Sequence, residues 1–154
     1  MSKINEPSMV SPNEKYKIII IDDDEGLCRL VQKKLNRAGF QTNIADSGEA
    51  ALRKIEGTPR EILLIDYKLP DISAKELVEK LKEKHGATPV FLAMTGFGDE
   101  KIAVEMMKLG AKDYIIKESD FVELLFEKLG HIVDHLQKNK EKERTQKLLL
   151  NTER

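Results

Sequence analysis

Five short apolar runs alternate with helix-type spacings along this chain, and the alternation restricts its possible folds more than any other feature of the sequence. Each run is rich in β-branched or aliphatic residues, and a helical pattern follows it, such as Leu27, Val31 and Leu35 after the first run. The runs cover residues 18–21, 42–45, 62–65, 90–94 and 114–116. Repeated strand–helix units favour an open parallel sheet with helices on both faces. The alternation therefore predicts an α/β fold with a doubly wound, five-stranded parallel sheet.

The length of the chain, 154 residues, suits one domain with a substantial hydrophobic core. Its 26 basic and 27 acidic side chains give a net charge of −1, which does not favour direct binding to nucleic acid or to an anionic membrane. Residues 1–14 lack the apolar segment of a signal peptide, and we expect them to form a disordered leader. We expect the domain to cover residues 15–136, followed by a charged helical tail or linker over 137–154.

The cysteine content and the apolar runs bear on location. Cys28 is the only cysteine, so no disulfide can form within the chain, which fits a reducing compartment. The apolar runs are far shorter than the roughly 20 residues that a helix needs to cross a bilayer. We therefore expect a cytoplasmic protein without a membrane-spanning segment.

Acidic, hydroxyl and basic side chains follow four of the predicted strands at the point where each strand ends. Because the functional residues of open parallel sheets gather at the carboxyl ends of the strands, these side chains are expected to converge. They are Asp22, Asp23 and Asp24 after the first strand, Asp66 after the third, Thr95 after the fourth and Lys117 after the fifth.

Carboxylates crowded at the end of a buried strand repel one another and lose hydration, so they must protonate, point into water or share a cation. Mg²⁺ prefers hard oxygen ligands and keeps part of its water shell, which suits such a cluster, and Mn²⁺ can substitute for it. A carboxylate in this place can also act as a nucleophile toward phosphorus. Asp66 is the best candidate because it stands singly at the end of its strand, and Thr95 and Lys117 can stabilise the added negative charge.

Four motifs resemble the receiver domain of two-component response regulators: IIIIDDDEG, LLIDYKLPD, VFLAMTG and GAKDYIIK, in this order. The resemblance covers about residues 15–136. It implies a flavodoxin-like (βα)5 fold with strand order 2-1-3-4-5. It also implies that Asp66 is the phosphoacceptor, and that Mg²⁺ is held by Asp22, Asp23, Asp66 and the backbone carbonyl of Lys68. The implied phosphoryl ligands are Thr95, Lys117 and the backbone N–H groups of Tyr67 and Gly96.

The resemblance further implies a signalling function without turnover of a separate substrate. Asp66 would receive a phosphoryl group from a sensor histidine kinase or a histidine phosphotransfer protein. Thr95 and Tyr114 would then switch the surface formed by the fourth helix, the fifth strand and the fifth helix. A partner, an output domain or a second copy in a homodimer would read this surface.

Several positions depart from the family pattern. Glu118 follows Lys117 where the family usually has a proline in a cis bond, and a cis bond is strongly disfavoured before a non-proline residue. A glycine common after the LPD turn is absent, because Ser73 and Ala74 stand there. Lys68 and Phe97 flank the phosphorylation site and offer no carboxylate or amide to orient a water molecule, so we predict slow self-dephosphorylation.

Two other functions compete with this interpretation. A phosphatase of the haloacid dehalogenase type would use Asp22 as its nucleophile, since Asp22, Asp23 and Asp24 formally fit its Asp-x-Asp motif. The chain lacks the cap domain and the later acidic pair expected of that class. A binding module could also keep the receiver fold without using phosphate, as the departures at Glu118 and Ser73 would allow.

Overall fold

A single parallel sheet of five strands forms the centre of the computed structural model, which describes residues 11–96 and 100–152. The strand order is β2-β1-β3-β4-β5, so the predicted order and the α/β class are confirmed. The strands are β1 (Lys17–Ile21), β2 (Gln41–Ala45), β3 (Glu61–Asp66), β4 (Val90–Thr95) and β5 (Asp113–Ile116). The helices are α1 (Glu25–Arg37), α2 (Gly48–Lys54), α3 (Ala74–His85), α4 (Glu100–Leu109) and α5 (Phe121–Thr152), with a 3-10 turn, η2 (Pro12–Lys15), before β1.

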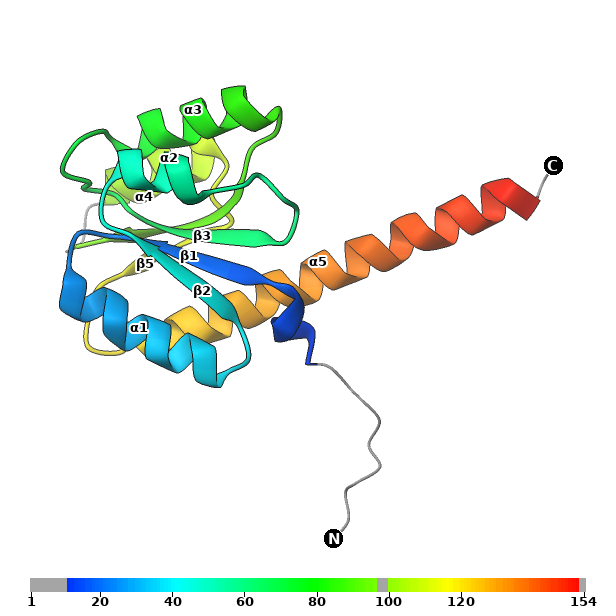
Figure 1. Cartoon of the computed structure of the whole chain (residues 1–154), viewed down its shortest axis with the longest axis horizontal. Helices are drawn as coiled ribbons and strands as arrows, with labels where there is room; N and C mark the ends of the chain where they lie inside the picture. Colours follow the sequence, from blue (N-terminus) through cyan, green and yellow to red (C-terminus); the bar gives the residue numbers. More distant parts are fainter. Residues whose placement is uncertain (1–10, 97–99, 153–154) are drawn as a thin grey trace, which may run out of the picture.

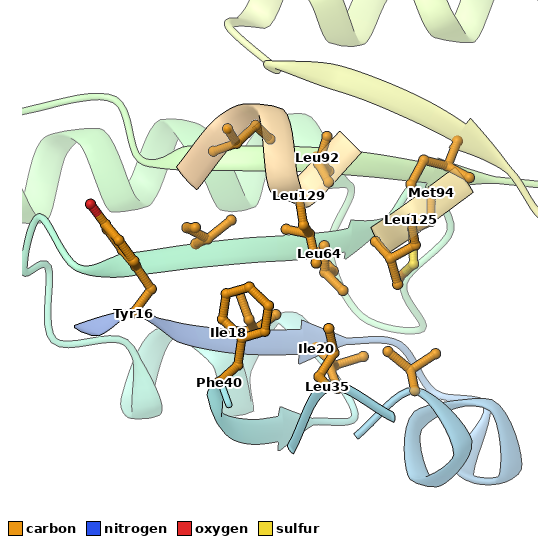
Figure 2. Packing of buried hydrophobic residues seen from close by; sticks show 14 of the residues in the cluster. Tyr16, Ile18, Ile20, Leu35, Phe40, Leu64, Leu92, Met94, Leu125 and Leu129 are labelled. Atoms are coloured by element: carbon orange, nitrogen blue, oxygen red, sulfur yellow. The ribbon is translucent and has the colours of Figure 1, made fainter. Parts of the chain in front are cut away.

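The helices cover both faces of the sheet, α1 and α5 on one side and α2, α3 and α4 on the other (Figure 1). Neighbouring residues of a strand point to opposite faces, so Ile18 and Ile20 pack toward α1 and α5, while Ile19 and Ile21 pack toward α2 and α3. Figure 2 shows the first of these clusters, in which Leu64 of β3 lies close to Ile20. Because both faces are covered, the central strands are apolar at nearly every position.

Local signals in the sequence account for the helix ends. The side chains of Asp24, Ser47 and Ser73 accept hydrogen bonds from backbone N–H groups in the first turns of α1, α2 and α3, at 3.1, 3.0 and 3.0 Å. At the other end of α3, Gly86 adopts a left-handed conformation with φ of 82°. Ser47 and Gly86 thus mark the start of α2 and the end of α3.

A pair of glycine substitutions tests this account of the α3 end. A Cβ atom at either Gly86 or Gly130 would meet no neighbouring atom within 4 Å. Gly86→Ala is expected to lower the free energy of unfolding by about 1 kcal/mol because an L side chain is strained at positive φ. Gly130→Ala, inside α5, is expected to raise it by about 0.5–1 kcal/mol. Urea denaturation measures both changes, and equal signs for the two variants would contradict the explanation.

At both ends of the domain, helical structure extends past the expected boundary. Residues 12–14, which we expected inside a disordered leader, belong to η2, where the Asn13 side chain donates a hydrogen bond to the Ala38 carbonyl at 2.8 Å. Residues 1–10 lie outside the described part of the chain. At the other end, α5 runs for 32 residues without a break, and residues 138–151 are exposed as the helix extends away from the sheet (Figure 1). The boundaries at 14 and 136 stay predictions. Within the described residues no helix is both long and apolar enough to span a bilayer.

Candidate functional site

Three carboxylates meet at the carboxyl end of the sheet, as the sequence predicted. Asp22 follows β1 directly, and Asp66 is the last residue of β3. Together with Asp23 they each offer one ligand atom within 4.8 Å of the others. Asp22 and Asp66 are buried, whereas Asp23 is exposed. Three hard oxygen donors that are close together and open to water on one side suit Mg²⁺ in chemistry and in spacing.

Asp24, the remaining acid of the first cluster, has a local structural role. Its side chain caps α1 by accepting a hydrogen bond from the Leu27 N–H at 3.1 Å. A negative charge is also favourable at the start of a helix. The acidic run therefore divides into two residues that face the site and one that starts a helix.

Lys117 reaches across the sheet edge to two of the acids. Its Nζ lies 2.6 Å from Oδ2 of Asp22 and 3.4 Å from Oδ2 of Asp66. The backbone brings it there because the Lys117 N–H donates to the Thr95 carbonyl at 2.8 Å, and the Glu118 N–H then closes a tight turn on the Ile116 carbonyl. No peptide bond in the described residues is cis. The loop therefore directs the lysine into the site without the proline usual in the family.

The charges in the site influence one another. Burial and then the charge of Asp22 raise the pKa of Asp66 above its ordinary value, although Lys117 and the Lys68 N–H act in the opposite direction. Burial alone would lower the pKa of Lys117, but the hydrogen bond and charge of Asp22 and the charge of Asp66 outweigh it and raise this pKa. The cluster therefore holds more negative charge than one ammonium compensates, which is the condition that a divalent cation would relieve.

Asp22 is held in place by two further contacts that the sequence did not indicate. Its Oδ1 accepts a hydrogen bond from the Asp24 N–H at 2.9 Å, and its carbonyl oxygen accepts one from the Cys28 thiol at 3.3 Å. Burial and then the charge of Asp22 raise the pKa of the Cys28 thiol to about 12, so the thiol stays protonated and can donate. Cys28 on α1 thus helps to position the acid rather than only filling space.

The backbone after Asp66 differs from the prediction made for Tyr67. The Tyr67 N–H, expected to bind the phosphoryl group, donates instead to the Met94 carbonyl at 2.8 Å and extends the pairing of β3 with β4 by one step. The backbone N–H that reaches the Asp66 carboxylate is that of Lys68, which donates to Oδ1 of Asp66 at 3.3 Å. Lys68 therefore replaces Tyr67 among the candidate phosphoryl ligands.

The other predicted residues lie around this edge of the sheet. Thr95 ends β4 and is buried, and Gly96 follows it directly. Tyr114 lies on β5 level with Ala93 of β4 and packs on the α3 and α4 side of the sheet. Phe97, named in the prediction of slow dephosphorylation, lies outside the described residues.

Comparison with known proteins decides the family. The model of the family described as the response regulator receiver domain matches residues 18–127. The chain belongs to this family. Receiver domains are modules of two-component signal transduction, so the resemblance seen in the four motifs is confirmed.

Relatives of this receiver domain are regulators of greater length. The transcriptional regulatory protein ZraR of Klebsiella oxytoca is 33% identical over 121 residues, which cover 77% of this chain and 27% of ZraR. The regulatory protein AtoC of Escherichia coli is 31% identical over 108 residues, covering 70% of this chain and 23% of AtoC. The transcriptional regulatory protein FixJ of Bradyrhizobium diazoefficiens is 35% identical over 103 residues, covering 67% of this chain and 50% of FixJ. The chain thus spans between 23% and 50% of the length of these relatives.

Solved structures agree with the fold. A CheY-like receiver domain from Methanospirillum hungatei JF-1 superposes with a TM-score of 0.71 at 29% identity and covers 80% of this chain and 98% of that one. The structure titled FixJ-N has a TM-score of 0.66 at 30% identity, covering 78% and 94% of the two chains. These neighbours match the sheet and its helices along almost their whole length.

Proposed function

We propose that this receiver domain accepts a phosphoryl group on Asp66 from the phosphohistidine of a sensor histidine kinase or a histidine phosphotransfer protein. An Oδ atom of Asp66 attacks phosphorus, the P–N bond to the donor imidazole breaks, and its electron pair returns to the ring nitrogen. The ring nitrogen takes up a proton from solvent as the bond breaks, so the products are an acyl phosphate on Asp66 and a neutral imidazole. The observation that carries the proposal is the convergence of the Lys117 ammonium and the Lys68 N–H on the Asp66 carboxylate.

The surrounding residues have separate tasks in this reaction. Asp22, Asp23, Asp66 and the Lys68 carbonyl would hold Mg²⁺, which when bound neutralises the negative charge that gathers as phosphate approaches carboxylate. Lys117 and the Thr95 hydroxyl would donate to the phosphoryl oxygens, joined by the N–H groups of Lys68 and Gly96. The nucleophile must be ionised. Because burial and the charge of Asp22 raise the pKa of Asp66, phosphorylation is expected to begin to weaken, as the pH falls, at a higher pH than it would at an ordinary aspartate.

The geometry favours Asp66 over Asp22 as the nucleophile. The Asp22 side chain is fully buried and holds the Lys117 ammonium at 2.6 Å, whereas the same ammonium lies 3.4 Å from Asp66. The Asp66 side chain keeps 10% of its surface exposed. A phosphatase of the haloacid dehalogenase type, which would attack through Asp22, is therefore the weaker alternative.

Phosphorylation would change the face formed by α4, β5 and α5, and a partner would recognise this change. Tyr114 lines a hollow on this face together with Val104 and Met107, two apolar residues of α4 that are 54% and 44% exposed. An inward movement of Thr95 toward the phosphoryl group would free space for the Tyr114 ring and bias this face toward a second arrangement. Its reader would be a partner protein, an output domain or a second copy. We propose direct binding to neither nucleic acid nor membrane, and a cytoplasmic location.

Beryllofluoride with Mg²⁺, together with a phosphorylation experiment, tests the proposal. Amide signals of residues around Asp66, Thr95 and Tyr114 are expected to shift on titration with beryllofluoride, and acetyl phosphate is expected to add one phosphoryl group that mass spectrometry places on Asp66. Asp66→Asn is expected to remove both responses, while Asp23→Asn is expected to weaken but not abolish them. Phosphate found on Asp22 would favour the phosphatase, and an unchanged spectrum would favour a passive binding module.

The acyl phosphate is expected to be long-lived. Lys68 is exposed beside Asp66 and has an ammonium group, which cannot accept a proton from an attacking water molecule as a carboxylate can. Lys68→Glu is therefore expected to speed loss of phosphate by about tenfold or more. The decay of phosphorylated protein after removal of acetyl phosphate measures this rate. A wild-type half-life of seconds would refute the expectation.

A further inference from the structure

The loop between β3 and α3 is tied to the start of α2 by one side chain. Asp71, in this loop, accepts a hydrogen bond from the Gly48 N–H through Oδ1 at 2.8 Å and another from the Glu49 N–H through Oδ2 at 2.9 Å. The first N–H groups of a helix have no partner within the helix. Ser47, the cap of α2, satisfies the N–H of Ala50. Asp71 thus completes the cap of α2 from more than twenty residues away.

The contact between the loop and α2 is close. A Cβ atom at Gly48 would lie 2.3 Å from Cγ1 of Ile72 and 3.3 Å from Oδ1 of Asp71. Only a residue without a side chain lets the loop approach α2 this far. The bonds from Gly48 and Glu49 also lower the pKa of Asp71, which favours the ionised carboxylate that accepts both bonds.

The same loop presents the Lys68 peptide to Asp66. Only Leu69 and Pro70 separate Lys68 from Asp71, and the ring of Pro70 restricts the backbone between them. On the far side of Asp71, Ser73 caps α3. The loop residues 67–73 include no glycine. A displacement of Asp71 would therefore also move the Lys68 peptide, whose N–H donates to Asp66, because few free backbone torsions lie between the two residues.

We propose that Asp71 is a positioning residue, which by its two hydrogen bonds to the start of α2 holds the Lys68 peptide in place for Mg²⁺ and phosphoryl binding at Asp66. This inference rests on the proposed function of Asp66. It assigns to α2, which contributes no side chain to the site, the task of anchoring the loop that does.

Two variants that both weaken the cap of α2 separate positioning from stability. Asp71→Ala removes two of the hydrogen bonds that cap α2 together with the tie to the loop, whereas Ser47→Ala removes only the cap bond within α2. Asp71→Ala is expected to weaken Mg²⁺ binding, followed by amide shifts, about tenfold, as loss of a partner behind a metal ligand typically does. Ser47→Ala is expected to leave the Mg²⁺ affinity within about twofold of wild type. Asp71→Asn keeps one acceptor oxygen and should fall between wild type and Asp71→Ala.

Hydrogen exchange at the Lys68 amide provides a readout that needs no metal. In metal-free protein this exchange is expected to speed up in Asp71→Ala and to stay near the wild-type rate in Ser47→Ala. Wild-type exchange and affinity in Asp71→Ala, or equal effects in both variants, would overturn the inference. If wild type itself bound neither Mg²⁺ nor beryllofluoride, the proposed function would fail, while the exchange rates would still report on the tie.

Discussion

Lys117→Met is expected to lower the free energy of unfolding of the metal-free protein by about 3 kcal/mol. The Asp22 side chain is fully buried, and the Lys117 Nζ lies 2.6 Å from its Oδ2. Removing one partner of a buried ion pair leaves the other charge without compensation, which costs far more than the loss of an exposed pair. The pKa of Asp66 should rise further, since Lys117 lowers it in the wild type. Urea denaturation in the presence of a chelator measures the effect.

Mg²⁺ is expected to restore much of the lost stability, because a divalent ion can take over the neutralisation of the three acids. The gain in stability on adding Mg²⁺ should be larger in Lys117→Met than in wild type. Lys128→Met is the matched control. Lys128 contacts Asp113 at 2.8 Å, but this pair is 26% and 38% exposed, so its loss should cost less than about 1 kcal/mol. A Lys117→Met protein as stable as wild type would show that Lys117 does not hold the Asp22 charge.

Phe91→Ala is expected to lower the free energy of unfolding by about 3–5 kcal/mol, the range for truncating a buried aromatic ring. Phe91 of β4 is fully buried and lies beside Leu63 of β3, in the cluster covered by α3 and α4. The substitution removes apolar contacts and leaves a cavity that the surrounding helices can only partly close.

Leu148→Ala provides the control for the size of this effect. Leu148, on the extended part of α5, is 60% exposed, and its truncation should change the free energy by no more than about 0.5 kcal/mol. Urea denaturation of the two variants compares them directly. A loss below about 1 kcal/mol for Phe91→Ala would contradict the packing of β4 between the two helix layers.

Much of the site could be predicted because its residues stand at strand ends. A strand covered on both faces is apolar until it leaves the sheet, so the first polar residue marks its end, as Asp22 and Lys117 do. Parallel strands place these ends at one edge, and the convergence of Lys117 with Asp22 and Asp66 follows from topology.

The backbone ligands could not be assigned in the same way. Whether the Tyr67 N–H is free depends on how far β3 and β4 remain paired beyond Asp66, and that register has no signal in the residue types. The sequence also left undecided how Lys117 is oriented without a following proline. In the structure, a tight hydrogen-bonded turn with trans peptide bonds brings Lys117 to the acids.

The sequence by itself determined the order of strands and helices, the caps at Asp24, Ser47 and Ser73, and the residues that would meet at the sheet edge. These features depend on periodicity and on side chains acting within a few residues of themselves. Only the tertiary structure decided that Asp71 would cap α2 and that Cys28 would hold the Asp22 carbonyl. Such hydrogen bonds join groups that become neighbours only after the helices have packed on the sheet, so no local pattern encodes them.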